Sequence, residues 1–132
     1  MLHILLVEDN PADVLMVREA VRATPVTTDL MIAYDGEQAL RFLTEFHFEP
    51  DIVFLDLIVP KLDSFEFLEK HLGVNQAPVI VLTGSVNPTD NQRAMELGAR
   101  EYIVKPSDMD EYVHVVSDAV GRWGSQAAAR GV

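Results

Sequence analysis

Five side chains that could do chemistry together stand at the ends of short apolar runs: Glu8, Asp9, Asp56, Thr83 and Lys105. Three carboxylates that meet in one crevice repel one another, and a hard divalent cation such as Mg²⁺ removes that repulsion. The lysine adds positive charge and the threonine adds a hydroxyl donor. Transfer of a phosphoryl group to a carboxylate requires this set, because an aspartate oxygen attacks while cations and donors neutralise the phosphoryl oxygens. Asp56 is the candidate nucleophile, since a carboxylate among so many apolar neighbours is costly without partners.

The apolar runs have the length and composition of strands that are buried on both faces of a sheet. The predicted strands are Leu2–Val7, Thr27–Ala33, Asp51–Leu55, Pro78–Leu82 and Glu101–Val104. A helical pattern follows each strand, and this alternation predicts an α/β fold with a doubly wound, five-stranded parallel sheet and five helices. The strand order 2-1-3-4-5 of flavodoxin-like folds is adopted from known folds of this class. In that order the carboxyl ends of the strands bring the five side chains to one edge of the sheet.

The last helical pattern runs from Met109 to Trp123, with apolar residues spaced as on one face of a helix. Ser107 is the expected cap of this helix. Residues 124–132 are small and polar, and they are predicted to form a flexible C-terminal tail after a single domain of residues 1–123. Trp123 is expected to overhang the edge of the sheet as an interface anchor. The alternative is that Trp123 folds back onto the core.

Charge and composition limit the classes of partner. The formal net charge of −11 argues against binding to nucleic acid, because the phosphate backbone would be repelled. The absence of cysteine excludes disulfides, thiolate zinc sites and thiol catalysis. The apolar start of the chain is too short to span a bilayer and lacks the features of a signal peptide, so no membrane partner is expected and the cytoplasm is the expected location.

Four short motifs stand where the predicted strands end. They are Leu-Val-Glu8-Asp9-Asn10, Asp56 with Pro60 four residues later, Thr83, and Tyr102-Ile-Val-Lys105-Pro106. Together they resemble the receiver domain of two-component response regulators, and the resemblance extends from about Leu2 to Val120. The opening Glu-Asp-Asn-Pro-Ala-Asp is also similar to the single-domain regulators that partner bacterial phytochrome kinases.

The resemblance implies a role for each candidate residue. Asp56 would accept a phosphoryl group from a sensor histidine kinase, which could be a bacterial phytochrome, and Lys105 would bind that phosphoryl group. Mg²⁺ (or Mn²⁺) would be held by Glu8, Asp9, Asp56 and the main-chain carbonyl of Ile58. The protein would be a phosphoacceptor rather than an enzyme, with at most slow self-phosphorylation and autodephosphorylation.

The resemblance also implies a route from phosphorylation to output. Thr83 and Tyr102 would form a switch pair that alters the face built from the fourth helix, the fifth strand and the fifth helix. Because the chain has no room for a DNA-binding or enzymatic output domain, that face is expected to bind a partner or a second copy of the chain. Two residues depart from the family pattern: Ile58 replaces a polar or amide residue that is frequent there, and Ser64 stands where Asp-Gly is common.

Three other functions compete with this interpretation. A flavodoxin-like cofactor binder shares the architecture, but it needs a Gly/Ser/Thr-rich phosphate loop where this chain has Glu8, Asp9 and Asn10. An aspartyl-phosphate phosphatase needs a second acid two residues after the nucleophile, where this chain has Ile58. A pseudo-receiver that acts only by contact, without phosphorylation of Asp56, is the third alternative.

Overall fold

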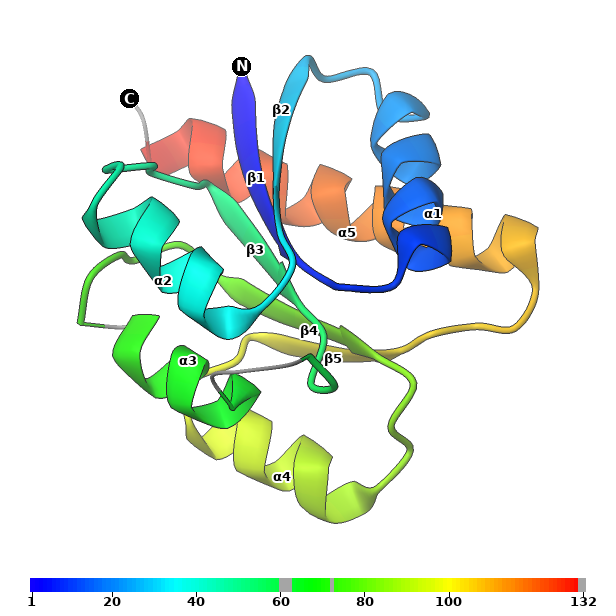
Figure 1. The fold of residues 1–132 in the computed structure, drawn as a ribbon. Coiled ribbons are helices and arrows are strands. Elements are labelled where there is room, and N and C mark those ends of the chain that lie inside the picture. Colours follow the sequence, from blue (N-terminus) through cyan, green and yellow to red (C-terminus); the bar gives the residue numbers. More distant parts are fainter. Residues whose placement is uncertain (60–62, 72, 131–132) are drawn as a thin grey trace.

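The computed structural model describes residues 1–59, 63–71 and 73–130, with side chains up to residue 126. It is a five-stranded parallel sheet in the order β2-β1-β3-β4-β5 with five helices, which confirms the predicted fold class and strand order (Figure 1). The strands are β1 Leu2–Val7, β2 Thr28–Ala33, β3 Ile52–Leu55, β4 Val79–Thr83 and β5 Glu101–Val104. The helices are α1 Pro11–Arg22, α2 Gly36–Thr44, α3 Ser64–His71, α4 Pro88–Glu96 and α5 Met109–Arg130.

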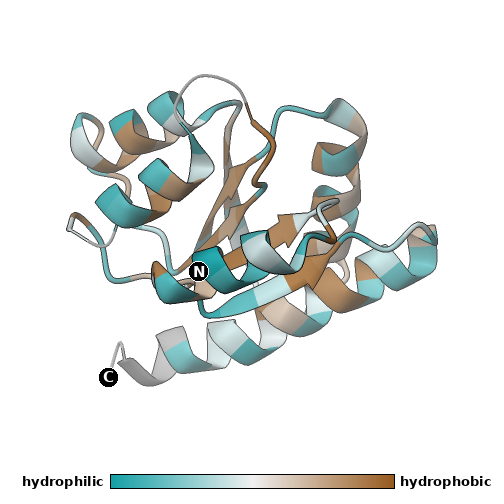
Figure 2. Cartoon of the chain, turned by 90° about the horizontal axis from the view of Figure 1, so that it is seen from below, coloured by the Kyte–Doolittle hydropathy of each residue, from teal (hydrophilic) through white to brown (hydrophobic). Residues whose placement is uncertain are grey.

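Helices cover both faces of the sheet, as continuous apolar strands require. Alternate residues of β1 point to opposite faces. Leu2, Ile4 and Leu6 pack with α1 and α5 in one core cluster. Leu5 and Val7 pack with α2, α3 and α4 in the other. Figure 2 shows the result, with apolar strands inside and hydrophilic helix faces outside.

Local sequence signals set where most helices begin. Asn10 caps α1, because its side chain accepts from the backbone N–H of Ala12 at 2.9 Å. Asn87 caps α4 in the same way. The predicted cap at Ser107 is wrong: the side chain of Asp108 accepts from the N–H of Glu111 at 2.9 Å, so α5 begins one residue later. Aspartate also suits this position because its charge complements the positive end of the helix dipole.

The C-terminal end of α5 differs from the prediction. The helix continues through residues 124–130, past the predicted helix end at Trp123, while the predicted flexibility of the tail stays a prediction. The hydroxyl of Ser125 donates to the carbonyl of Gly121 at 2.9 Å within the helix. A Cβ atom on Gly124 would lie 3.2 Å from the side chain of Leu2, so glycine lets the helix pass close to the start of β1. Pro60 of the family motif and the last two residues of the predicted tail lie outside the described residues.

Among the described residues, none of the helices combines the length and the apolar character needed to cross a bilayer.

Candidate active site

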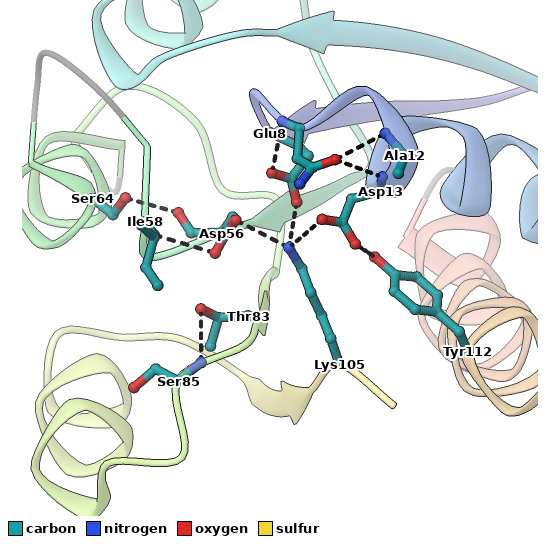
Figure 3. Close-up of polar contacts among 11 residues, drawn as sticks. Glu8, Ala12, Asp13, Asp56, Ile58, Ser64, Thr83, Ser85, Lys105 and Tyr112 are labelled. Atoms are coloured by element: carbon teal, nitrogen blue, oxygen red, sulfur yellow. Dashed lines mark hydrogen bonds and ion pairs between the residues drawn. The ribbon is translucent and has the colours of Figure 1, made fainter. Parts of the chain in front are cut away.

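The candidate residues meet because backbone hydrogen bonds align the strand ends. The N–H of Asp56 donates to the carbonyl of Val7 at 3.1 Å, which holds the residue after β3 beside the end of β1. The N–H of Lys105 donates to the carbonyl of Thr83 at 2.8 Å, which holds the residue after β5 beside the end of β4. The parallel register therefore places Glu8, Asp56, Thr83 and Lys105 at one edge of the sheet (Figure 3).

Lys105 lies at the centre of the site. Its Nζ is 2.7 Å from Oε1 of Glu8, 3.0 Å from Oδ2 of Asp13 and 3.1 Å from Oδ2 of Asp56. The ammonium group donates hydrogen bonds to Glu8 and Asp56 and forms an ion pair with Asp13. Burial disfavours the charged lysine, but the hydrogen bond with Glu8 and the charge of Asp56 outweigh it and raise the pKa of Lys105 above its ordinary value. The lysine is thus a fixed positive charge next to the candidate nucleophile.

Glu8 is a buried carboxyl group whose ionisation is disfavoured by its surroundings. The residue is 1% exposed. Burial raises the pKa of Glu8 to about 7, and the neighbouring charge of Asp56 adds to this effect, although the hydrogen bond from Lys105 opposes it. A further positive charge near Glu8 would favour the ionised carboxylate and lower its pKa.

The donor set fits a hard divalent cation. Glu8, Asp9 and Asp56 each offer one carboxylate oxygen, and these oxygens lie within 4.8 Å of one another. They line an open cavity of about 500 Å³, which also leaves room for water ligands and a phosphoryl group. All three donors are oxygens, as Mg²⁺ and Mn²⁺ prefer. The raised pKa of Glu8 is a second indication, because a bound cation would favour the ionised form that burial disfavours.

The loop after Asp56 holds this residue from both sides. Its Oδ1 accepts from the N–H of Ile58 at 3.2 Å, and its main-chain carbonyl accepts from the hydroxyl of Ser64 at 2.8 Å. Ser64 is 2% exposed, so the residue that departs from the family pattern has a buried partner. Ile58 is 66% exposed beside the cavity, and the role of its carbonyl as a metal ligand stays a prediction.

Thr83 and Tyr102 are linked through one residue. Oγ1 of the buried Thr83 accepts from the N–H of Ser85 at 3.4 Å. The hydroxyl of the half-buried Tyr102 donates to the carbonyl of Ser85 at 3.0 Å. A displacement of the threonine would therefore reach the tyrosine through the backbone between β4 and α4, and the switch role of this pair stays a prediction.

Sequence reasoning missed Asp13 and Tyr112. Oδ1 of Asp13 accepts from the hydroxyl of Tyr112 at 2.9 Å, while its other oxygen contacts Lys105 (Figure 3). Asp13 stands in the first turn of a helix, where an acid is ordinary, and Tyr112 fits the apolar stripe of α5. The sequence carries no signal that would pair them, because they are far apart along the chain.

Trp123 folds back against the core, which was the alternative, and does not overhang the edge of the sheet as predicted. It is half-buried and packs against the core cluster shared by α1 and α5. Its indole N–H donates to Oε1 of Glu101 at 2.9 Å, and Arg122 contacts the same carboxylate. An interface role for Trp123 stays a prediction.

Comparison with known proteins decides the family. The family model for the response regulator receiver domain matches residues 4–117. The chain belongs to this family. As a receiver, it is related to signalling phosphoacceptors of two-component systems rather than to metabolic enzymes.

Phytochrome response regulators are among the similar proteins. The receiver is 32% identical to response regulator Rcp1 of Synechocystis sp. (strain ATCC 27184 / PCC 6803 / Kazusa) over 128 residues, covering 91% of this chain and 87% of Rcp1. The solved Mn²⁺-bound form of Rcp1 superposes with a TM-score of 0.83 at 30% identity, covering 93% of this chain and 94% of that chain. The phosphorylated cyanobacterial phytochrome response regulator RcpA superposes with a TM-score of 0.87 at 30% identity, covering 94% of each chain.

Other relatives are longer than the receiver. The chain is 36% identical over 102 residues to the probable transcriptional regulator ycf27 of Porphyridium aerugineum. That alignment covers 77% of this chain but 41% of the relative, so the receiver spans less than half of that protein.

Proposed function

We propose that this receiver accepts a phosphoryl group on Asp56 from a sensor histidine kinase and passes the signal on through its surface. The observation that carries the proposal is the position of Lys105. Its Nζ lies 3.1 Å from Oδ2 of Asp56 in a cavity that also holds Glu8 and Asp9. A nucleophilic carboxylate, a fixed cation and an acidic pair able to hold a metal are thereby within reach of one phosphoryl group.

The reaction forms one bond and breaks one. An oxygen of Asp56 attacks the phosphorus atom, and the bond from phosphorus to the kinase histidine nitrogen breaks. The electron pair of that bond returns to the imidazole, which takes up a proton from solvent. Lys105 neutralises the phosphoryl oxygens as charge moves onto Asp56, because its pKa keeps it protonated throughout the physiological range.

Glu8, Asp9 and Asp56 would hold the cation, with the main-chain carbonyl of Ile58 as a fourth protein ligand. When bound, Mg²⁺ or Mn²⁺ would supply charge neutralisation for the phosphoryl oxygens and for the three carboxylates. The Mn²⁺-bound structure of Rcp1 supports the class of ion. Among the two ions we propose Mg²⁺ as the working cofactor.

Output would follow from Thr83. Its hydroxyl would leave Ser85 for the phosphoryl group, and Tyr102 would follow through the shared contact with Ser85. This movement would change the face built from α4, β5 and α5 and so favour a partner or a second copy of the chain. The similarity to Rcp1 and RcpA supports a bacterial phytochrome as the kinase.

Intact-mass spectrometry tests the proposal. The wild type is expected to gain one phosphate from acetyl phosphate or from a phosphorylated histidine kinase, and only when Mg²⁺ or Mn²⁺ is present. Asp56→Asn is expected to gain none under the same conditions. Asp51→Asn is the matched control, because it removes an equal charge at the opposite end of β3. Equal gains on the wild type and on Asp56→Asn would overturn the assignment.

A further inference from the structure

The carboxylate of Asp13 is engaged on both sides by residues from other parts of the fold. Its Oδ2 lies 3.0 Å from Nζ of Lys105, which follows β5. Its Oδ1 accepts at 2.9 Å from the hydroxyl of Tyr112, which lies in α5. An acid in the first turn of a helix usually serves the helix dipole and points to solvent. Here the side chain is 19% exposed and joins three elements at the edge of the active site.

The three carboxylates around Lys105 differ in whether they belong to the cluster that fits a metal ion. Two of the three partners of Lys105, Glu8 and Asp56, belong to the cluster that fits a divalent cation. Asp13 is outside that cluster. A cation at the site would draw the oxygens of Glu8 and Asp56 toward itself, whereas Asp13 would remain beside the ammonium group. Asp13 is therefore the partner that can hold Lys105 both before and after the metal binds.

Tyr112 fixes the direction in which Asp13 points. Tyr112 is 4% exposed and packs within the core cluster between α1 and α5, so its hydroxyl has little freedom. Burial raises the pKa of Tyr112, and the charge of Asp13 raises it further, so the phenol stays a neutral donor at physiological pH. A buried donor that engages one carboxylate oxygen leaves the other oxygen aimed at Lys105 (Figure 3).

We propose that Asp13 is a positioning residue for Lys105 and that Tyr112 orients Asp13. The proposal rests on the proposed phosphoryl transfer to Asp56, because Lys105 assists that transfer. Asp13 and Tyr112 hold the side chain of Lys105 in place for it. The function of this arrangement is to keep the ammonium group of Lys105 at the phosphoryl site while the metal is bound by Glu8, Asp9 and Asp56.

Lysine ammonium NMR tests the positioning without any phosphorylation. The wild type is expected to show a slowly exchanging ammonium signal that Lys105→Met lacks, with or without Mg²⁺. Asp13→Asn and Tyr112→Phe are expected to lose or broaden that signal. The control Asp110→Asn removes an equal charge from the first turn of α5 without touching the site, and it is expected to keep the signal. A signal unchanged in Asp13→Asn and in Tyr112→Phe would overturn the proposal.

Phosphorylation rates separate positioning from simple stability. With acetyl phosphate and Mg²⁺, Asp13→Asn is expected to slow phosphorylation about tenfold when Lys105 is present, because a misplaced catalytic group costs rate. In a Lys105→Met background the same substitution is expected to have no further effect. Equal slowing in both backgrounds would show that Asp13 does not act through Lys105 and would overturn the proposal. A wild type that gains no phosphate would refute the proposed function instead, and the NMR measurement would still decide the positioning.

Discussion

Glu8 should make the metal-free protein less stable as the pH rises. The carboxyl is buried, and burial raises its pKa from an ordinary 4.5 to about 7. Between these two values the folded protein binds more protons than the unfolded chain, so the free energy of unfolding falls with increasing pH. The loss begins near the pKa of the unfolded chain and is complete above the pKa of the folded protein. The perturbation that tests this is Glu8→Gln, which keeps the shape of the side chain and removes the titration.

The expected size follows from the two pKa values. A difference of roughly 2.5 in pKa corresponds to about 3 kcal/mol. The wild type should therefore lose about 3 kcal/mol more than Glu8→Gln between pH 4 and pH 8. The comparison with Glu8→Gln is needed because His71 acts in the opposite direction. Burial lowers the pKa of His71, so its contribution to stability increases with pH up to its ordinary value of 6.5.

Urea unfolding in the presence of a chelator measures both proteins. The single tryptophan gives a fluorescence signal, and circular dichroism provides a second probe of the same transition. Saturating Mg²⁺ should remove most of the difference at pH 8, because a bound cation offsets the charge of Glu8. Parallel pH profiles for the wild type and Glu8→Gln without metal would refute the reasoning, since they would show that Glu8 ionises in the fold at no cost.

Three further predictions concern the surroundings of Asp56 and the C-terminal helix. Ile58→Asn should shorten the phosphorylated half-life several-fold, because an amide can hold the attacking water in line and an aliphatic side chain cannot; an unchanged or longer half-life in a phosphate-release assay would contradict this. Ser64→Ala should lower the free energy of unfolding by about 1–2 kcal/mol, because the carbonyl of Asp56 loses a buried donor; a urea midpoint equal to that of the wild type would count against it. Trp123→Ala should weaken self-association measured by light scattering with a phosphoryl mimic; a folded mutant that assembles like the wild type would remove Trp123 from the interface, and a protein monomeric in every state would indicate a foreign partner.

The arrangement of the strand ends could be predicted because it depends on local sequence. Apolar runs without alternation indicate buried parallel strands, and polar residues directly after them must lie at the carboxyl edge of the sheet. The meeting of Glu8, Asp56 and Lys105 follows from that rule and from the strand order. The order itself came from the known fold class, since residue patterns alone do not specify which strands are neighbours.

Long-range pairs and the end of α5 could not be predicted in the same way. The contact between Asp13 and Tyr112 joins residues whose local patterns indicate a helix start and a core stripe, and nothing in either pattern refers to the other. Gly121 and Gly124 weaken a helix in isolation. In the fold, the close approach of Gly124 to Leu2 accommodates the extended helix, a tertiary effect that overrides the local preference.

Chemical trapping of the phosphorylated residue tests the central claim most directly. Borohydride reduces an acyl phosphate to an alcohol, so a phosphorylated aspartate becomes homoserine and can be located by peptide mass spectrometry. After incubation with acetyl phosphate and Mg²⁺, homoserine is expected at residue 56 and at none of the other aspartates, and it should be absent when Mg²⁺ is chelated. Homoserine at a different aspartate, or phosphorylated protein with an intact Asp56, would contradict the account.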